Sequence, residues 1–237
     1  MKISGAGSLP GGDYQEEIHI GGSGKVTGNV SCTEFGISGT GTVLGNLRCS
    51  GKVNSSGSGK VKGDLEANDV STSGAFSVDG GLHCKKTAAS GMLQAASVTA
   101  DAIHVSGMLK CDEDISAEDA VIHGCVESGG LINADKLEVV FDSGSKANCI
   151  GGSSIRIRRK GVVGAAILKF IGKKDAGYFK VNGSIEGDDI DIEYVIAESV
   201  TGRNVKIVPG CKIGRVTYSG NYTGNDESEI GTVETSK

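Results

Sequence analysis

The residues of this 237-residue chain that could bind a metal or carry redox chemistry are seven cysteines and four histidines. No Cys-x-x-Cys pair occurs, and an odd number of cysteines does not fit a disulfide framework. Cys32, Cys49 and Cys84 share one position of a repeat, described below, that alanine fills in other copies. We therefore expect packed core thiols, with Cys32 and Cys49 on adjacent strands roughly 4.8 Å apart, close enough to pair.

The histidines do not gather at one place. His19, His83, His104 and His123 fall in different repeats. His19 and His104 share a repeat position, but five repeats, roughly 24 Å, separate them. This spacing predicts neither a metal site nor a catalytic triad.

Two acidic clusters, residues 112–114 and 188–191, favour solvated turns; a Ca²⁺ site or the paired carboxylates of a glycosidase are the alternatives. Gly-Ser-Gly-Lys-Val at residues 22–26 lacks the full spacing of a phosphate-binding loop and recurs at residues 57–61, which indicates architecture. The sequence thus predicts no catalytic residue, no cofactor and no small-molecule substrate, and we expect that the protein is not an enzyme.

The elements that position these residues belong to an internal repeat of about 17 residues. Apolar residues recur in registered columns, and small residues follow the same interval. The clearest column is Val30, Leu47, Leu65, Leu82, Val98, Ile115, Ile132 and Ile150. Glycines recur in step with it at Gly22, Gly39, Gly57, Gly74, Gly91, Gly107 and Gly124.

Within each repeat, apolar and polar residues alternate over short segments that end at glycines, as in β-strands with one face inward. A glycine at a fixed place marks a sharp corner, where a positive φ or a close chain approach excludes a Cβ. No window shows helical periodicity. Three short strands per repeat predict an all-β fold, a parallel β-helix built as a triangular solenoid.

We expect one solenoid domain with five segments. They are an N-terminal cap over 1–17, β-helix turns over 18–157, a basic interruption over 158–184, further turns over 185–220 and a polar C-terminal tail over 221–237. Ile230 and Val233 could form a partial last turn of that tail.

The interruption is basic: residues 156–180 hold eight Lys and Arg against one acid, on a chain of net charge −5. A solvated strand face or a loop leaving the coil explains this charge, and a patch for an anionic membrane or an acidic partner is the alternative. Such a basic patch would contain Arg156, Arg158, Arg159, Lys160, Lys169, Lys173 and Lys174.

The charge and hydropathy of the whole chain limit its location. A net charge of −5 argues against nucleic acid as a partner. No apolar run approaches the roughly 18 residues of a membrane span, and the first residues lack a signal-peptide core. We expect a cytoplasmic protein, with peripheral membrane contact through the basic segment as an alternative.

Two stretches, ISGAGSLPGGDYQEEIHIGGSGKVTGNV and SIEGDDIDIEYVIAESVTGRNVKIVPGCKIGRVTYSG, together with the repeats, resemble the bactofilins, polymer-forming cytoskeletal proteins of bacteria. The likeness covers roughly residues 3–220 and is greatest to a longer variant of spore-forming Gram-positive bacteria. It implies a right-handed β-helix that polymerises end to end without nucleotide and supports cell shape or envelope processes. The chain lacks proline-rich tails and carries the basic interruption, unlike shorter bactofilins.

Unpaired backbone groups at the two ends of a β-helix independently favour stacking of one chain on another. We expect a structural filament of identical chains, with related bactofilins as further partners. The polymer interface is predicted to involve Ile3, Tyr14, Ile18 and Ile20 at one end and Val216, Tyr218 and Tyr222 at the other. An adaptor that uses the basic segment, and a β-helix acyltransferase or polysaccharide-active enzyme, are the alternatives.

Overall fold

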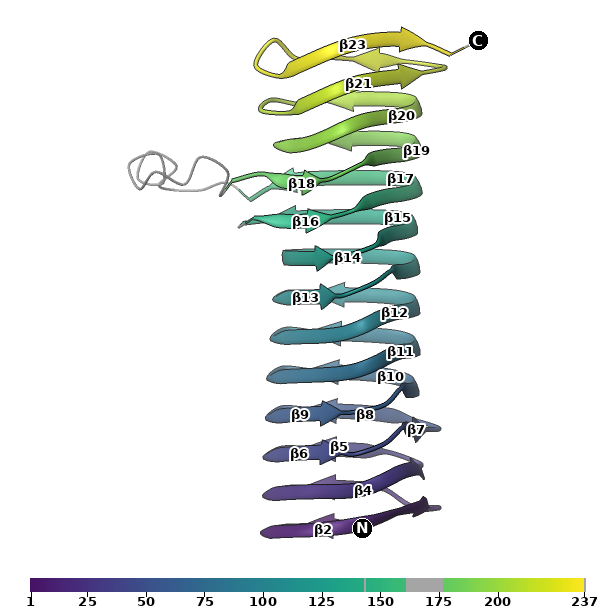
Figure 1. Ribbon diagram of the computed structural model, residues 1–237, viewed down its shortest axis with the longest axis vertical. Helices are drawn as coiled ribbons and strands as arrows, with labels where there is room; N and C mark the ends of the chain where they lie inside the picture. The colour runs from purple at the N-terminus through teal and green to yellow at the C-terminus, as the bar shows by residue number, and fades with distance from the viewer. Residues whose placement is uncertain (143, 161–176, 237) are drawn as a thin grey trace, which may run out of the picture. The chain divides into compact units, whose positions relative to one another are not determined.

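The computed structural model describes residues 1–142, 144–160 and 177–236, and every regular element in them is a β-strand (Figure 1). The chain divides into two compact units, Met1–Ala117 and Glu118–Lys237. Each unit is a parallel β-solenoid with about 17 residues per turn, so the predicted fold class is confirmed.

The strands of the first unit are β1 (Lys2–Ile3), β2 (Ala6–Asp13), β3 (Ile18–Ile20), β4 (Ser23–Cys32), β5 (Phe35–Ile37), β6 (Thr40–Val43), β7 (Leu47–Cys49), β8 (Lys52–Ser55), β9 (Ser58–Val61), β10 (Leu65–Thr72), β11 (Ala75–Ala89), β12 (Met92–Val105) and β13 (Met108–Cys111). β14 (Ile115–Ser128) begins there and continues into the second unit. The second unit adds β15 (Leu131–Phe141), β16 (Ser145–Ala147), β17 (Cys149–Arg159), β18 (Phe179–Val181), β19 (Ser184–Ile192), β20 (Val195–Ile207), β21 (Lys212–Tyr218), β22 (Tyr222–Thr223) and β23 (Glu229–Thr235).

In the first unit, the strands stack in three parallel columns, one on each face of the coil. Face A contains β1, β3, β5 and β8; face B contains β6, β9 and the first residues of β2 and β4; face C contains β7 and the last residues of β2 and β4. On face C, Val30 lies opposite Leu47, which lies opposite Leu65. This register confirms the apolar column that the sequence predicts.

Alternation along each strand builds the core, because every second side chain points inward. Val26, Val43 and Val61 on face B are completely buried, whereas the residues beside them are exposed or half-buried. Small and large side chains also complement one another between turns: a Cβ at Gly59 would lie 2.4 Å from the ring of Phe76. The ring of Phe76 thus fills the space that the missing side chain of Gly59 leaves in the neighbouring turn.

One corner of the coil needs glycine because successive turns approach closely. A Cβ at Gly39 would lie 2.1 Å from the carbonyl oxygen of Gly22, and a Cβ at Gly57 would lie 2.0 Å from that of Gly39. The backbone φ is not positive at any of these three residues. Close approach, the second of the two predicted reasons, therefore explains glycine at these positions, whereas Gly124 of the same column has a positive φ of 143°.

A second corner carries a ladder of Asn and Asp side chains. Asn29 Oδ1 accepts the backbone N–H of Asn46 at 2.9 Å, and Asn46 Oδ1 accepts that of Asp64 at 3.0 Å. Asp64 Oδ1 continues the ladder to the N–H of Gly81 at 2.9 Å. Each side chain satisfies a backbone donor of the following turn, where the corner interrupts the strand pairing.

The first turn differs from the predicted cap over residues 1–17. β1 pairs with β3, which places Ile3 beside Ile20, and β2 pairs with β4, which places Leu9 beside Val26. Residues 2–13 therefore form a regular turn. Ile3 and Leu9 precede their partners Ile20 and Val26 by seventeen residues, but Pro10 and the surrounding glycines make this repeat hard to recognise in the sequence.

The second unit resumes its register after the basic segment. Ile150 pairs with Ile185, and that position continues through Val200, Val216 and Val233 at intervals of 15, 16 and 17 residues. Arg158 and Arg159 still belong to β17, and β18 already pairs with β16. The solenoid strands therefore extend into both ends of the predicted interruption at 158–184.

The C-terminal residues also form a turn where a polar tail over 221–237 is predicted. β22 pairs with β20, and β23 pairs with β21 from Glu229 to Thr235. Ile230 and Val233 continue the columns of Ile213 and Val216, which explains why this polar stretch is ordered.

Candidate functional site: the outer edges of the terminal turns

The N-terminal edge of the first unit is an open edge of the sheet. β1 and β2 pair with β3 and β4 on one side, and no strand in the described part of the chain pairs with their other side. An edge of this kind presents unpaired N–H and C=O groups, which can template pairing with another chain.

Apolar side chains accompany this edge. Ile3 is half-buried, although its register partner Ile20 is completely buried. Leu9 is 8% exposed and lies beside the completely buried Val26. The difference arises because no described strand lies on the outer side of β1, so Ile3 is covered from one side only.

The C-terminal edge of the second unit is also an open sheet edge, and its apolar side chains are more exposed. Within residues 144–160 and 177–236, β22 and β23 pair only with β20 and β21, on one side. Val233 is 43% exposed, whereas its register partner Val216 is completely buried. Ile230 is half-buried beside Ile213, which is 3% exposed. The core columns thus end in uncovered apolar side chains.

Four predicted interface residues lie in or next to these terminal turns. Ile3 is in β1, and Tyr14 follows β2 and donates its hydroxyl to the carbonyl oxygen of Pro10 at 2.9 Å. Tyr222 is in β22 and stacks on Tyr218 with ring centroids 5.4 Å apart. The two tyrosine rings therefore lie together at the corner between the end of β21 and the start of β22.

The other three predicted interface residues are interior. Ile18 and Ile20 in β3 and Val216 in β21 are completely buried, with paired strands on both sides. They cannot contact a second chain, because the additional first and last turns cover them. Leu9, Ile230 and Val233 also lie in the terminal turns but are not among the predicted interface residues; the offset of seventeen residues from Leu9 to Val26 and from Val216 to Val233 is the signal that places them there.

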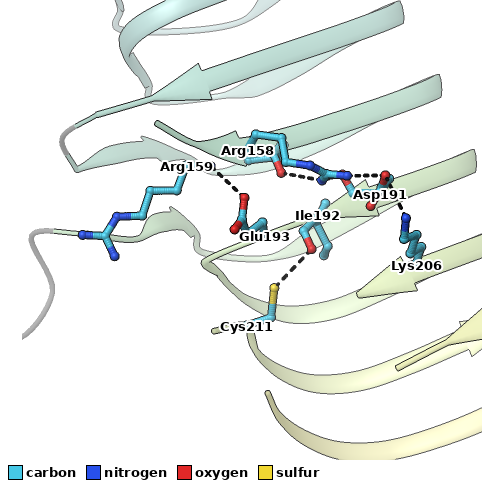
Figure 2. Close-up of polar contacts among 8 residues, drawn as sticks. Arg158, Arg159, Asp191, Ile192, Glu193, Lys206 and Cys211 are labelled. Atoms are coloured by element: carbon cyan, nitrogen blue, oxygen red, sulfur yellow. Dashed lines mark hydrogen bonds and ion pairs between the residues drawn. The ribbon is translucent and has the colours of Figure 1, made fainter. Parts of the chain in front are cut away.

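Two residues of the predicted basic patch, Arg158 and Arg159, make contacts within their own chain. Figure 2 shows the guanidinium of Arg158 directed at Asp191: it pairs with the carboxylate and also donates to the Asp191 carbonyl oxygen at 3.0 Å. Lys206 Nζ lies 3.9 Å from the same carboxylate. The pair is half-buried, with 21% and 31% of the two side chains exposed.

Arg159 is held by the turn between β19 and β20. Its backbone N–H donates to the Glu193 carboxylate at 3.3 Å, and its guanidinium lies 4.6 Å from the ring centroid of Tyr194. Arg156 and Lys160 are exposed. Lys169, Lys173 and Lys174 lie outside the described residues, so the predicted patch is not brought together by the part that is described.

The thiols are mostly core residues, as predicted. Cys32, Cys49, Cys111, Cys125 and Cys211 are buried, and all seven cysteines are free. Burial raises the pKa of Cys111 to about 12 and that of Cys211 to about 11. Cys32 and Cys49 are register partners, which confirms the predicted adjacency.

Two further structural findings concern other kinds of site. No group of three or more His, Cys, Asp or Glu side chains in residues 1–142, 144–160 and 177–236 is arranged to hold a metal ion. No helix in those residues is long and apolar enough to cross a membrane.

Comparisons with known proteins agree with the resemblance for part of the chain. Over 105 residues the chain is 33% identical to the uncharacterized protein YhbE of Bacillus subtilis (strain 168). The matched segment is 44% of this chain and 42% of YhbE. The chain therefore matches less than half the length of that curated relative. No solved structure matches significantly. Residues 2–83 match the family model of the bactofilins, a structural family described as polymer-forming cytoskeletal.

Proposed function

We propose that the chain is the subunit of a cytoskeletal filament that grows by end-to-end stacking of β-solenoids, without nucleotide. The observation that carries the proposal is Val233, which is 43% exposed at the end of a column whose preceding member, Val216, is completely buried. A second chain placed on this edge would supply the covering turn.

Stacking at such an edge uses the same interactions as stacking inside the molecule. Each internal turn is held by backbone hydrogen bonds and by apolar contacts with its two neighbours, and a terminal turn has only one neighbour. Both contributions become available when two edges meet. Because these contributions come from the strands and core themselves, assembly needs no nucleotide hydrolysis.

The same reasoning extends to the partners and the cellular role. Backbone edges can be matched by any β-solenoid with the same turn length, so related bactofilins are proposed as further partners. The family description of residues 2–83 supports a scaffold role, which we propose serves cell shape or envelope and spore organisation in a bacterium.

The experiment compares Val233→Lys with Leu44→Lys. Val233 and Leu44 are similarly exposed, at 43% and 40%, but Leu44 lies between β6 and β7, away from the terminal turns. Purified wild-type protein without nucleotide is expected to form filaments in negative-stain micrographs and to sediment. Val233→Lys places a charge at the edge and should abolish both, whereas Leu44→Lys should preserve both.

Circular dichroism and urea unfolding establish that each variant is folded. Monodisperse wild-type particles at high concentration would overturn the filament proposal. Filaments of folded Val233→Lys equal to those of the wild type would instead refute the assignment of this edge.

A further inference from the structure

Two cysteines near the N-terminal edge form an isolated pair in the core. Cys32 ends β4 and Cys49 ends β7, and the two residues are register partners on face C. They are 5% and 3% exposed. The pair therefore joins the second and third turns of the first unit, at a corner where each strand stops.

The geometry of a parallel register pair is compatible with a disulfide. Adjacent strands lie about 4.8 Å apart, within the Cα separation of roughly 4.4–6.8 Å that disulfides span. The side chains of Cys32 and Cys49 also point to the same side, because both are buried at equivalent positions. The two thiols also affect each other's protonation: the interaction with Cys49 raises the pKa of Cys32, and the interaction with Cys32 lowers the pKa of Cys49.

The Cys49 thiol can donate to the backbone carbonyl oxygens of Thr33 at 3.2 Å and Lys52 at 3.4 Å, yet its pKa is lowered. The hydrogen bond from Cys32 lowers the pKa of Cys49 to about 7, and the backbone N–H groups of Gly51 and Phe35 act in the same direction. Burial and the nearby Glu34 carboxylate oppose this shift. The pKa of Cys32 is raised, chiefly because its proton is held in the hydrogen bond to Cys49. The direction of these shifts favours the proton on Cys32 and makes Cys49 the more acidic thiol of the pair.

Burial alone does not create this property. Cys111 is 2% exposed, about as buried as Cys49, yet desolvation raises its pKa to about 12. Its sulfur remains a thiol at neutral pH and is a poor nucleophile. Cys111 thus serves as an internal reference for reactivity at matched exposure.

We propose that Cys32 and Cys49 form a modification site, a dithiol that a peroxide oxidises to a disulfide between the second and third turns. The Cys49 thiolate attacks a peroxide oxygen, the O–O bond breaks, and the leaving hydroxide takes a proton to become water. Cys49 is thereby oxidised to a sulfenic acid and the peroxide is reduced. Cys32 then attacks the Cys49 sulfur, the S–S bond forms, and the displaced hydroxide leaves with the Cys32 proton as a second water.

The disulfide would close a short loop across one repeat and bind the third turn covalently to the second. Both residues belong to the first unit, so the proposal does not depend on assembly of the chain into filaments. It can be tested on the non-assembling Val233→Lys variant as well as on the wild type.

Trypsin makes the readout direct, because it cleaves after Lys25, Arg48 and Lys52 and so separates Cys32 from Cys49. The full-length protein is treated with hydrogen peroxide at pH 8, its free thiols are alkylated, and the digest is analysed by mass spectrometry. We expect peptides 26–48 and 49–52 to be linked with the loss of two hydrogens. Cys49 should be lost at least about tenfold faster than Cys111, because thiolate fraction outweighs the lower intrinsic nucleophilicity.

Alanine variants separate the two steps. Ala67 occupies the same repeat position as Cys49 one turn later, so alanine fits there. In Cys32→Ala, the Cys49 sulfenic acid should accumulate and be trapped by dimedone; in Cys49→Ala, Cys32 should stay reduced. Cys111→Ala should leave the linked peptide unchanged.

Three results would overturn the proposal in protein that circular dichroism shows to be folded. They are the absence of the linked peptide, disulfides that join different chains in its place, and loss of Cys49 no faster than loss of Cys111. If an alanine variant does not fold, the comparison of Cys49 with Cys111 in the wild type still decides.

Discussion

At the scale of single residues, the core contains hydroxyl groups that have no hydrogen-bond partner. The side-chain oxygens of Ser55, Thr72 and Thr87 are buried without one. Thr87 is completely buried between Val70 and Ile103 in its column. An unsatisfied buried hydroxyl costs free energy that an apolar side chain of the same shape does not.

Thr87→Val should therefore stabilise the protein. We expect the free energy of unfolding to rise by about 1 kcal/mol, because valine keeps the branched shape and removes the desolvated hydroxyl. Urea unfolding followed by circular dichroism measures it. Thr40→Val, at an exposed position of β6, is the matched control and should change stability little. A destabilised Thr87→Val would show that the hydroxyl has a stabilising partner.

At the scale of elements, the corners decide how the strands stack. A Cβ at Gly57 would meet the carbonyl oxygen of Gly39 at 2.0 Å, and backbone atoms cannot move aside as a side chain would. Gly5 occupies the same corner of the first turn, where nothing lies within 4 Å of a Cβ. Glycine at this repeat position is therefore crowded by backbone at Gly57 and has open space beside it at Gly5.

Gly57→Ala should lower the free energy of unfolding by about 2–3 kcal/mol, since the corner must open to admit the methyl group. Gly5→Ala is the control and should leave stability unchanged or slightly increased, because alanine restricts the unfolded chain. Both are measured by urea unfolding in the Val233→Lys background. An equal loss of unfolding free energy in Gly57→Ala and Gly5→Ala would contradict the role of close approach between turns.

The repeat made most of these elements predictable from sequence, because each column offers many examples of one position. Val30, Leu47 and Leu65 predict the register correctly. Ile18, Ile20 and Val216 were misassigned to the ends, because single terminal turns such as residues 2–13 and 222–235 have few apolar residues to reveal them. The contacts of Arg158 with Asp191 could not be predicted, since they join positions separated by a non-repeating segment.

At the scale of the whole molecule, the N-terminal edge offers a further test of assembly. At Gly22 and Gly39 the corner Cβ would point at the preceding turn, so at Gly5 it would point away from the first turn, into the space that a stacked chain would occupy. A neighbour that continues the solenoid register would place a carbonyl oxygen there.

Gly5→Ala should therefore impair assembly although it does not destabilise the chain. We expect the critical concentration for sedimentation to increase at least about tenfold, since one clash of roughly 1.4 kcal/mol or more is added at each junction. Gly144→Ala, whose Cβ would also meet nothing within 4 Å, is the control and should assemble normally. Unchanged assembly of Gly5→Ala would mean that junctions at this edge do not continue the register.

The positions of the aromatic residues have an optical consequence. The chain has no tryptophan and five tyrosines, so its near-ultraviolet emission is that of tyrosine alone. Tyr14 follows β2 of the first turn, and Tyr218 and Tyr222 stack beside the last turn. Tyr178 and Tyr194, 6.0 Å apart, lie near the end of β17. An unlabelled sample therefore carries its own fluorophores at both terminal turns, and its emission can follow the burial of those turns in real time.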